Sequence, residues 1–324
     1  MRQQLLEMLM NHQGEFLSGQ QISDQLNCSR TAIWKHIAEL RKQGYQVEAA
    51  PKKGYRILSS PDAVTADEIS IRLKTEKFGR QIVSKESVSS TQEIAHKLSH
   101  EKCEEGTLVV ADEQTGARGR MGRPWQSPKG SGIWMSLILR PEIPLQRAPQ
   151  LTLLTAVAVV KAIHKVTGLN AEIKWPNDIL INGKKVVGIL TELQAEADRI
   201  NSVIIGIGMN VNLSSDELPD EIRGIATSLQ IETGQAIRRA DLIAAVMKEM
   251  EVLYKQYLQE GFHLIKLLWE SYALSLGKRI KVRTISGEFE GFAKGITDEG
   301  VLLLEDDENQ IHQIYSADIE IPRS

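Results

Sequence analysis

Cysteines, aromatic side chains and long hydrophobic runs are all scarce in this sequence of 324 residues. Its two cysteines, Cys28 and Cys103, are far apart and lack metal-ligand spacing, so we expect reduced thiols in a cytoplasmic protein. The longest apolar run, residues 151–160, is interrupted by threonines and is much shorter than the roughly 20 residues of a membrane-spanning helix. The first ten residues contain Glu7 and two glutamines, which predicts a folded helix and not a secretory signal.

Charge is nearly balanced overall, with 39 Lys and Arg against 42 Asp and Glu, but it is unevenly distributed. Residues 1–60 hold eight basic and five acidic residues, a charge of +3, which leaves −6 on the remaining chain. We therefore expect only the N-terminal part to meet a polyanion. The length predicts two or three domains, and 42% hydrophobic residues argue against wholesale disorder.

The first 60 residues have the pattern of a winged helix-turn-helix. Ser18 and Gln21 form a capping box at the start of a short helix, and a turn leads into a second helix over residues 30–43. Ile33, Ile37 and Leu40 are spaced to form one apolar stripe on this second helix. Two short strands, residues 45–47 and 55–58, then flank a turn that carries two lysines.

The polar side of the second helix is predicted to enter the major groove of DNA, and the lysines of the wing turn are predicted to contact phosphate. Trp34 is expected to pack within the domain and not to stack on bases. A small helical domain with merely solvated charges is the alternative. The predicted DNA-binding residues are Ser29, Arg30, Thr31, Lys35, His36, Lys52 and Lys53.

A polar stretch with a proline, residues 59–62, is predicted to link this domain to the rest of the chain. Beyond it, strands and helices alternate irregularly, which predicts an α+β domain with a largely antiparallel or mixed sheet. Asn182-Gly183 is the strongest hairpin signal. Strands are predicted over residues 81–85, 107–111, 132–140, 171–175, 184–194 and 201–212, and helices over residues 90–99, 148–166, 240–260 and 262–274.

Only short strands follow Lys278, separated by turns such as Ser286-Gly287, and they predict a small SH3-like β-barrel without evident chemistry. These strands are expected over residues 279–284, 288–296, 301–304 and 310–315. The sequence thus predicts an α+β multidomain protein. Its domains are a winged helix-turn-helix over residues 1–60, a central mixed-sheet α+β domain over residues 64–276 and the barrel over residues 277–324.

Three glycines and three arginines are interleaved in the segment GARGRMGR, residues 116–123. Glycine lets the backbone approach a ligand closely, and guanidinium groups match phosphate and carboxylate oxygens. Neither the P-loop pattern nor the dinucleotide pattern GxGxxG occurs in this segment. The loop therefore predicts an anion site, with a solvated basic loop as the alternative.

A second polar cluster consists of the segment KWPND, residues 174–178, and of Lys184 and Lys185 beyond the hairpin. Cations and a carboxylate at the ends of adjacent strands can converge on one pocket, with lysine for phosphate and aspartate for a metal or an amine. An ordinary charged surface hairpin is the alternative, and it is less expected for Lys174 than for Lys184.

These two segments, together with Ser90-Thr91-Gln92, Gln114, the strand KKVVGIL and the segment GIGMN at residues 206–210, are similar to the bacterial biotin protein ligases. With the N-terminal winged helix, the chain resembles from end to end the bifunctional members that also repress biotin genes. Ala117 stands where many members have glycine, but it removes no anion ligand.

The resemblance implies an ATP-dependent ligase that forms biotinyl-5'-AMP and transfers biotin to a lysine of the biotin carboxyl carrier protein of acetyl-CoA carboxylase. It also implies a biotin-responsive repressor that binds operator DNA of biotin genes as an adenylate-bound homodimer, without membrane association. Biotin, ATP and Mg²⁺ are the implied substrates and cofactors.

The resemblance also implies a role for individual residues. The biotin-binding residues implied are Ser90, Thr91, Gln92, Gln114, Arg118, Gly119, Arg120 and Lys185. The nucleotide-binding residues implied are Arg123, Lys174, Asn177 and Asn210. The catalytic residues implied are Arg118, Arg120, Lys185 and Asp178, with Asp178 facing the incoming lysine, and no residue is assigned as a metal ligand.

Two other functions stay open from the sequence. The first is a ligand-sensing repressor without ligase activity, against which the arginine loop, Lys185 and Asp178 argue. The second is a lipoate-type ligase, whose catalytic domain is similar. The DNA-binding module and the KWPND segment favour biotin.

Overall fold

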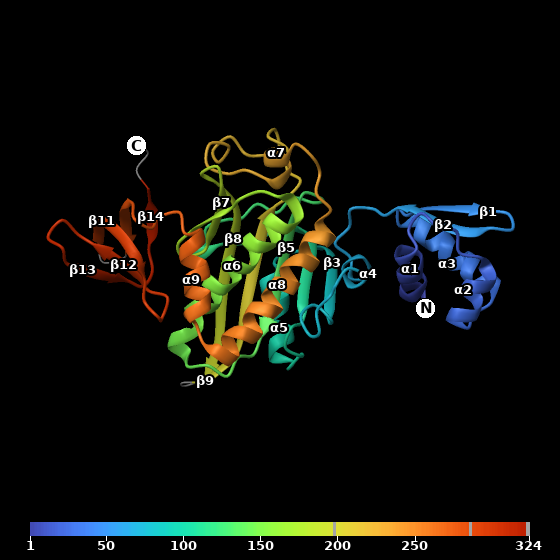
Figure 1. The fold of residues 1–324 in the computed structure, drawn as a ribbon, viewed down its shortest axis with the longest axis horizontal. Coiled ribbons are helices and arrows are strands. Elements are labelled where there is room, and N and C mark those ends of the chain that lie inside the picture. Colours follow the sequence, from blue (N-terminus) through green and yellow to red (C-terminus); the bar gives the residue numbers. More distant parts are fainter. Residues whose placement is uncertain (197–198, 285–286, 322–324) are drawn as a thin grey trace.

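The computed structural model describes residues 1–196, 199–284 and 287–321, and its three sheets follow one another along an elongated molecule (Figure 1). The N-terminal module and the C-terminal sheet lie at opposite ends, and the large sheet with its helices lies between them. The predicted turn Ser286-Gly287 lies partly outside the described residues.

The N-terminal module is a winged helix-turn-helix, as predicted. Ser18 Oγ accepts a hydrogen bond from the Gln21 N–H at 3.1 Å, and Gln21 Oε1 accepts one from the Ser18 N–H at 2.9 Å, which confirms the capping box. Its own core contains the predicted apolar stripe of the second helix, Ile33, Ile37 and Leu40. The elements are α1 (Arg2–Asn11), α2 (Gly19–Leu26), α3 (Arg30–Lys42), β1 (Gln46–Ala50) and β2 (Gly54–Ser59).

The prediction that Trp34 packs within this module is wrong. Its side chain is 63% exposed, whereas the preceding residue, Ile33, is buried in the core. Successive residues of a helix point about 100° apart, so burial of Ile33 turns Trp34 toward solvent.

The central sheet has seven strands in the order β3-β4-β5-β9-β8-β7-β6. In the described residues β3 and β4 pair in parallel and the other neighbours pair antiparallel, which confirms the mixed sheet. The predicted hairpin at Asn182-Gly183 joins β7 to β8. The strands are β3 (Ile82–Val88), β4 (Leu108–Gln114), β5 (Gly132–Leu139), β6 (Glu172–Lys174), β7 (Asp178–Ile181), β8 (Lys184–Glu196) and β9 (Arg199–Asn210).

Helices α6 (Ala148–Thr167), α8 (Arg239–Glu260) and α9 (His263–Tyr272) lie along one face of this sheet (Figure 1). Helix α5 (Thr91–His100) packs on the other face of the sheet. Successive residues of a strand point to opposite faces, and accordingly Leu108 belongs to the core under the three long helices, whereas Val109 belongs to a small cluster with Ala95 of α5. Shorter elements are α4 (Ala66–Ser70), α7 (Leu229–Thr233), η1 (Arg120–Gly122) and η2 (Leu145–Arg147).

The C-terminal domain is an antiparallel sheet in the order β13-β12-β11-β10-β14. The four predicted strands are present, and β14 was not predicted. In the described residues the edge strands β13 and β14 do not pair, so the sheet is open and not a closed barrel. Its apolar residues share one core with the central domain. The strands are β10 (Arg279–Thr284), β11 (Gly287–Ile296), β12 (Leu302–Glu305), β13 (Ile311–Ile314) and β14 (Asp318–Glu320).

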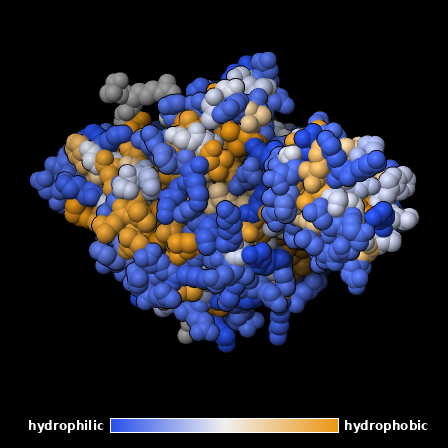
Figure 2. Space-filling view, turned by 45° about the vertical axis from the view of Figure 1, so that its right-hand side comes forward, coloured by the Kyte–Doolittle hydropathy of each residue, from blue (hydrophilic) through white to orange (hydrophobic). Residues whose placement is uncertain are grey.

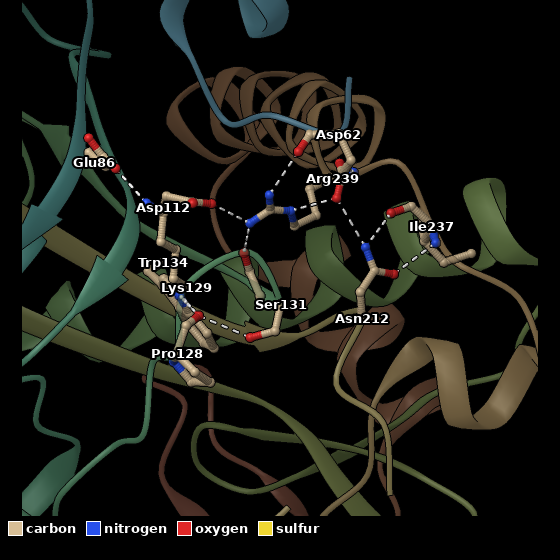
Figure 3. A network of polar contacts seen from close by, with 11 residues as sticks. Asp62, Glu86, Asp112, Pro128, Lys129, Ser131, Trp134, Asn212, Ile237 and Arg239 are labelled. Carbon is tan, nitrogen blue, oxygen red and sulfur yellow. Dashed lines mark hydrogen bonds and ion pairs between the residues drawn. The ribbon is translucent and has the colours of Figure 1, made fainter. Parts of the chain in front are cut away.

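The linker after the N-terminal module is fixed to the central domain by a polar network around Arg239 (Figure 3). Arg239 is 2% exposed, and its guanidinium donates to Asp62 at 2.8 Å and to Asp112 at 2.7 Å. Asn212 Nδ2 donates to the same Asp62 carboxylate at 3.1 Å and to the Ile237 carbonyl at 2.9 Å. Two carboxylates compensate the buried cation, so the linker residue Asp62 is part of the central domain's structure.

A second contact joins the N-terminal module itself to the central domain. The Tyr45 hydroxyl donates to Glu68, which is fully buried and also forms an ion pair with Arg72 at 3.0 Å. Burial raises the pKa of Glu68 above its ordinary value. The module is therefore in contact with the body through a buried polar cluster.

The face of the molecule shown in Figure 2 is mostly hydrophilic, including the N-terminal module at the right, with a broader hydrophobic area at the left. Cys28 and Cys103 are half-buried free thiols. Within the ranges that the structure describes, no helix has both the length and the apolar character needed to cross a membrane.

Candidate active site

A cavity of about 460 Å³ lies over the central sheet on the side of α5. It is bounded by the arginine loop, by a second loop over residues 213–226 and by Asp318 of the C-terminal domain. The predicted site residues that line it are Ser90, Thr91, Gln92, Gln114, Arg118, Gly119, Arg120, Arg123, Asn177, Asp178, Lys185 and Asn210. Lys174 is not among the lining residues, and it lies on β6 opposite Asp178.

Two glycines of β9, Gly206 and Gly208, form part of the floor of the cavity. A Cβ atom on Gly208 would lie 2.6 Å from Nε1 of Trp125, and one on Gly206 would lie 3.0 Å from Oε1 of Gln92. The absence of side chains therefore lets Trp125 and Gln92 lie close against the sheet. Sequence analysis missed Trp125, although a glycine inside a strand is a signal of close approach by another group.

Amide and hydroxyl groups line one end of the cavity. The backbone N–H of Thr91 donates to Gln114 Oε1 at 2.8 Å, and Gln114 Nε2 donates to Ser127 at 3.1 Å. Gln92 Nε2 donates to Glu192 at 2.9 Å. In contrast, Gln92 Oε1 and Trp125 Nε1 are buried and have no hydrogen-bond partner among the described residues. One acceptor and one donor are thus left for a polar ligand, because buried polar atoms are normally satisfied.

Cations line the other end. Lys185 Nζ lies 2.7 Å from Asp178 Oδ1 and 5.2 Å from the centre of the Trp125 ring. Arg120 donates to Asn177 Oδ1 at 3.1 Å and to Ser316 of the C-terminal domain at 2.8 Å. Burial lowers the pKa of Arg120 below its ordinary value. The arginine loop and the cluster around Asp178, which were predicted separately, thus lie together at this end of the cavity. Their cations can bind a carboxylate or a phosphate group.

The C-terminal domain contacts the arginine loop, although its sequence indicated no chemistry. Arg123 forms an ion pair with Asp318 of β14, and a further hydrogen bond joins Arg120 to the neighbouring Ser316. The hydrogen bond from Arg123 lowers the pKa of Asp318 and raises the pKa of Arg123, so both groups are charged at neutral pH. The loop is thereby held between two domains.

The loop over residues 213–226 is a part of the site that sequence analysis missed. It presents apolar side chains to the cavity, among them Leu218, Ile222 and Ile225. The Lys185 N–H donates to the Ile225 carbonyl at 2.8 Å, and the Thr227 N–H donates to the Lys185 carbonyl at 2.9 Å. The loop is therefore joined to the strand that carries Lys185. Leu218, Ile222 and Ile225 have the spacing of a helix face, but Pro219 and Gly224 disfavour a helix there, and sequence analysis assigned no element to this segment.

The predicted DNA-binding residues all lie on the N-terminal module. Arg30, Thr31 and Lys35 are exposed on α3, and Lys52 and Lys53 are exposed in the turn between β1 and β2. Arg30 also donates to Gln20 Oε1 at 2.9 Å, and the other two residues are partly used within the module. The Oγ of Ser29 caps α3 by accepting from Ala32 N–H, and the half-buried His36 lies 3.2 Å from Glu39.

Each of the three parts of the chain matches a known protein family. Residues 84–210 match the Biotin/lipoate A/B protein ligase family, residues 1–56 an HTH domain, and residues 275–321 the Biotin protein ligase C terminal domain.

Several relatives are similar over nearly the whole chain. The Bifunctional ligase/repressor BirA of Bacillus subtilis is 56% identical over 321 residues, 99% of this chain and 98% of that protein. Its Escherichia coli namesake is 31% identical over 94% of this chain and 92% of that protein. The solved biotin protein ligase from Aquifex aeolicus in complex with biotin and ATP has a TM-score of 0.66 at 33% identity, and covers 76% of this chain and 100% of that chain.

Proposed function

The chain belongs to the family of bifunctional biotin protein ligases and repressors, and we propose that its cavity makes biotinyl-5'-AMP from biotin and ATP. The observation that carries this proposal is that one cavity joins an amide-lined end to a cationic end. The ureido head of biotin has both N–H donors and a carbonyl acceptor, which suit the unpaired Gln92 Oε1 and Trp125 Nε1. The biotin carboxylate would then point toward Lys185 and Arg118.

The first chemical step follows from these positions. A carboxylate oxygen of biotin attacks the α-phosphorus of ATP, a new O–P bond forms, and the bond to the β-phosphate breaks to release pyrophosphate. Both reactants are anions, so the reaction needs fixed positive charge at the point of contact. We assign this role to Lys185, Arg118 and Arg120, with Arg123, Lys174, Asn177 and Asn210 toward the nucleotide.

The second step transfers biotin to a lysine of the carrier domain. The amine attacks the carbonyl carbon of the mixed anhydride, an amide bond forms, and AMP leaves. The carboxylate of Asp178 lies at the cationic end and would orient the amine and take up its proton. The loops over residues 116–123 and 213–226 would exclude water from the anhydride until the amine arrives.

Mg²⁺ would accompany ATP. In the described part of the chain, no three His, Cys, Asp or Glu side chains are grouped to hold a metal ion. Magnesium commonly binds phosphate oxygens and waters with few protein ligands, so no dedicated cluster of side chains is needed to hold it. The ion would neutralise phosphate charge.

We also propose that the N-terminal module binds operator DNA of biotin genes and that biotinyl-5'-AMP is the corepressor. A single wing module reads one half-site, so specific repression calls for a homodimer on a palindrome, formed when the adenylate is bound. The acceptor we propose is the biotin carboxyl carrier protein of acetyl-CoA carboxylase, in the cytoplasm. The domain boundaries we propose are residues 1–60, 64–276 and 277–324.

The test is biotin-dependent exchange of pyrophosphate into ATP, followed by transfer to purified carrier domains with biotin or lipoate. Exchange with biotin and labelling of the biotin carrier domain are expected. Operator binding without exchange would favour a ligand-sensing repressor, and activity with lipoate alone would favour a lipoate-type ligase.

A further inference from the structure

The exposed side of α3 carries a large aromatic side chain that the core of the module does not use. Trp34 is 63% exposed, and the core consists of other residues from α1, α2, α3 and the wing strands. The other four tryptophans, residues 125, 134, 175 and 269, are buried or half-buried. An exposed tryptophan is uncommon, and tryptophan is enriched where a protein binds a partner.

The position of Trp34 indicates which partner covers it. It lies four residues after Arg30 and three after Thr31, so the three side chains share one face of the helix. Lys35 and Lys42 are exposed further along the same helix, and Lys52 and Lys53 are exposed in the wing. A face with cations around one flat apolar side chain is complementary to a DNA duplex, which has charged phosphates outside and base edges in the groove.

Trp34 also differs chemically from the cations around it. Phosphate contacts position a protein on DNA, whereas contacts to base edges select the sequence. The N-terminal part of a recognition helix is the part that reaches the base edges, and Trp34 is the fifth residue of α3. An uncharged indole cannot form an ion pair with phosphate, although its N–H can donate one hydrogen bond, whereas its large apolar surface can pack on the C5-methyl group of thymine.

We propose that Trp34 is a sequence-specificity residue of the repressor, which reads a thymine methyl group in the major groove of each operator half-site. This inference rests on the proposed DNA binding and adds the residue and the base that it recognises. Loss of the ring would lower affinity for the operator and leave affinity for unrelated DNA nearly unchanged. Loss of a cation such as Lys35 would weaken binding to both.

The experiment uses the full-length protein with biotin and ATP. A pool of randomised DNA duplexes is first selected by the wild type to obtain its preferred duplex. Affinities for this duplex and for an unrelated duplex are then measured over a salt series for Trp34→Ala and Trp34→Phe. Leu58→Ala, which also removes an exposed apolar side chain of the module, is the matched control.

Trp34→Ala should bind the selected duplex about 10- to 100-fold more weakly, with an unchanged salt slope and unchanged affinity for the unrelated duplex. Trp34→Phe should retain part of the affinity, and Leu58→Ala all of it. Replacing the contacted thymine with deoxyuridine, which lacks the methyl group, should weaken the wild type but not Trp34→Ala.

Two results would overturn the inference while repression stands: equal loss of affinity for both duplexes, or no loss for either. The inference would also be overturned if each thymine is replaced in turn with deoxyuridine and no replacement weakens binding of the wild type more than binding of Trp34→Ala. If the wild type selects no preferred duplex at all, the proposed repressor function fails and this inference with it. Unchanged pyrophosphate exchange and thermal unfolding of the variants show that the fold is intact.

Discussion

Replacing Lys185 with alanine should slow biotin-dependent pyrophosphate exchange by about 30- to 150-fold. Its Nζ lies 2.7 Å from Asp178 Oδ1 at the cationic end of the cavity. In the proposed reaction this ammonium meets both the attacking carboxylate and the α-phosphate, so it stabilises charge that becomes concentrated in the transition state.

The magnitude follows from the surroundings of the side chain. Removal of one preorganised group that stabilises such charge costs about 2.7 to 4 kcal/mol in a water-excluded site. The Lys185 side chain is 34% exposed, so solvent screening reduces this to about 2 to 3 kcal/mol, which corresponds to the stated loss of rate. The unpaired Asp178 would add repulsion toward the substrates, so Lys185→Ala with Asp178→Asn should recover part of the exchange rate.

Lys184 provides the matched control, because it is the preceding residue of β8, is exposed and does not line the cavity. Exchange rates for Lys184→Ala, Lys185→Ala, Asp178→Asn and the double variant at positions 178 and 185 are compared at saturating ATP. If Lys185→Ala is no slower than Lys184→Ala, the assignment of Lys185 is refuted. Strictly additive effects in the double variant would refute the role of the ion pair.

Arg118 lies exposed on the loop, so Arg118→Ala should release biotinyl-5'-AMP faster and should increase the labelling of lysines in a bystander protein. A rate of adenylate release equal to that of the wild type would contradict this. A chain that starts at Val64 should keep exchange activity and lose operator binding. This chain also lacks Asp62, so the buried Arg239 loses one of its two carboxylate partners. Calorimetry should therefore show it to be about 2 to 3 kcal/mol less stable than a chain that starts at Ser60, and equal stability would argue against that contact. Burial raises the pKa of Glu68 above 4.5, which favours its neutral form in the fold. The wild type should therefore lose stability relative to Glu68→Gln as pH rises through that raised pKa, and a pH-independent difference in unfolding free energy would contradict this.

Local patterns predicted most of the secondary structure because they depend on neighbouring residues. The capping box at Ser18, the apolar spacing of α3 and the hairpin at Asn182-Gly183 all act over a few residues, and all three are present. The expectation for Trp34 was wrong because periodicity identifies an apolar stripe but does not show whether a large residue beside it is needed to close the core. Strand β14 was missed because three residues give almost no pattern.

The sequence by itself determined the chemistry: the arginine-glycine loop and the lysines around Asp178 indicated an anion site, and the family resemblance indicated which anions. Tertiary structure alone decided which distant groups meet there. Trp125 lies against Gly208, the loop over residues 213–226 is joined to Lys185, and Asp318 forms an ion pair with Arg123 from a separate sheet. Such contacts depend on strand order and domain packing, which bring together residues nearly 200 positions apart in the sequence. Local sequence patterns extend over only a few residues, so they cannot predict these contacts.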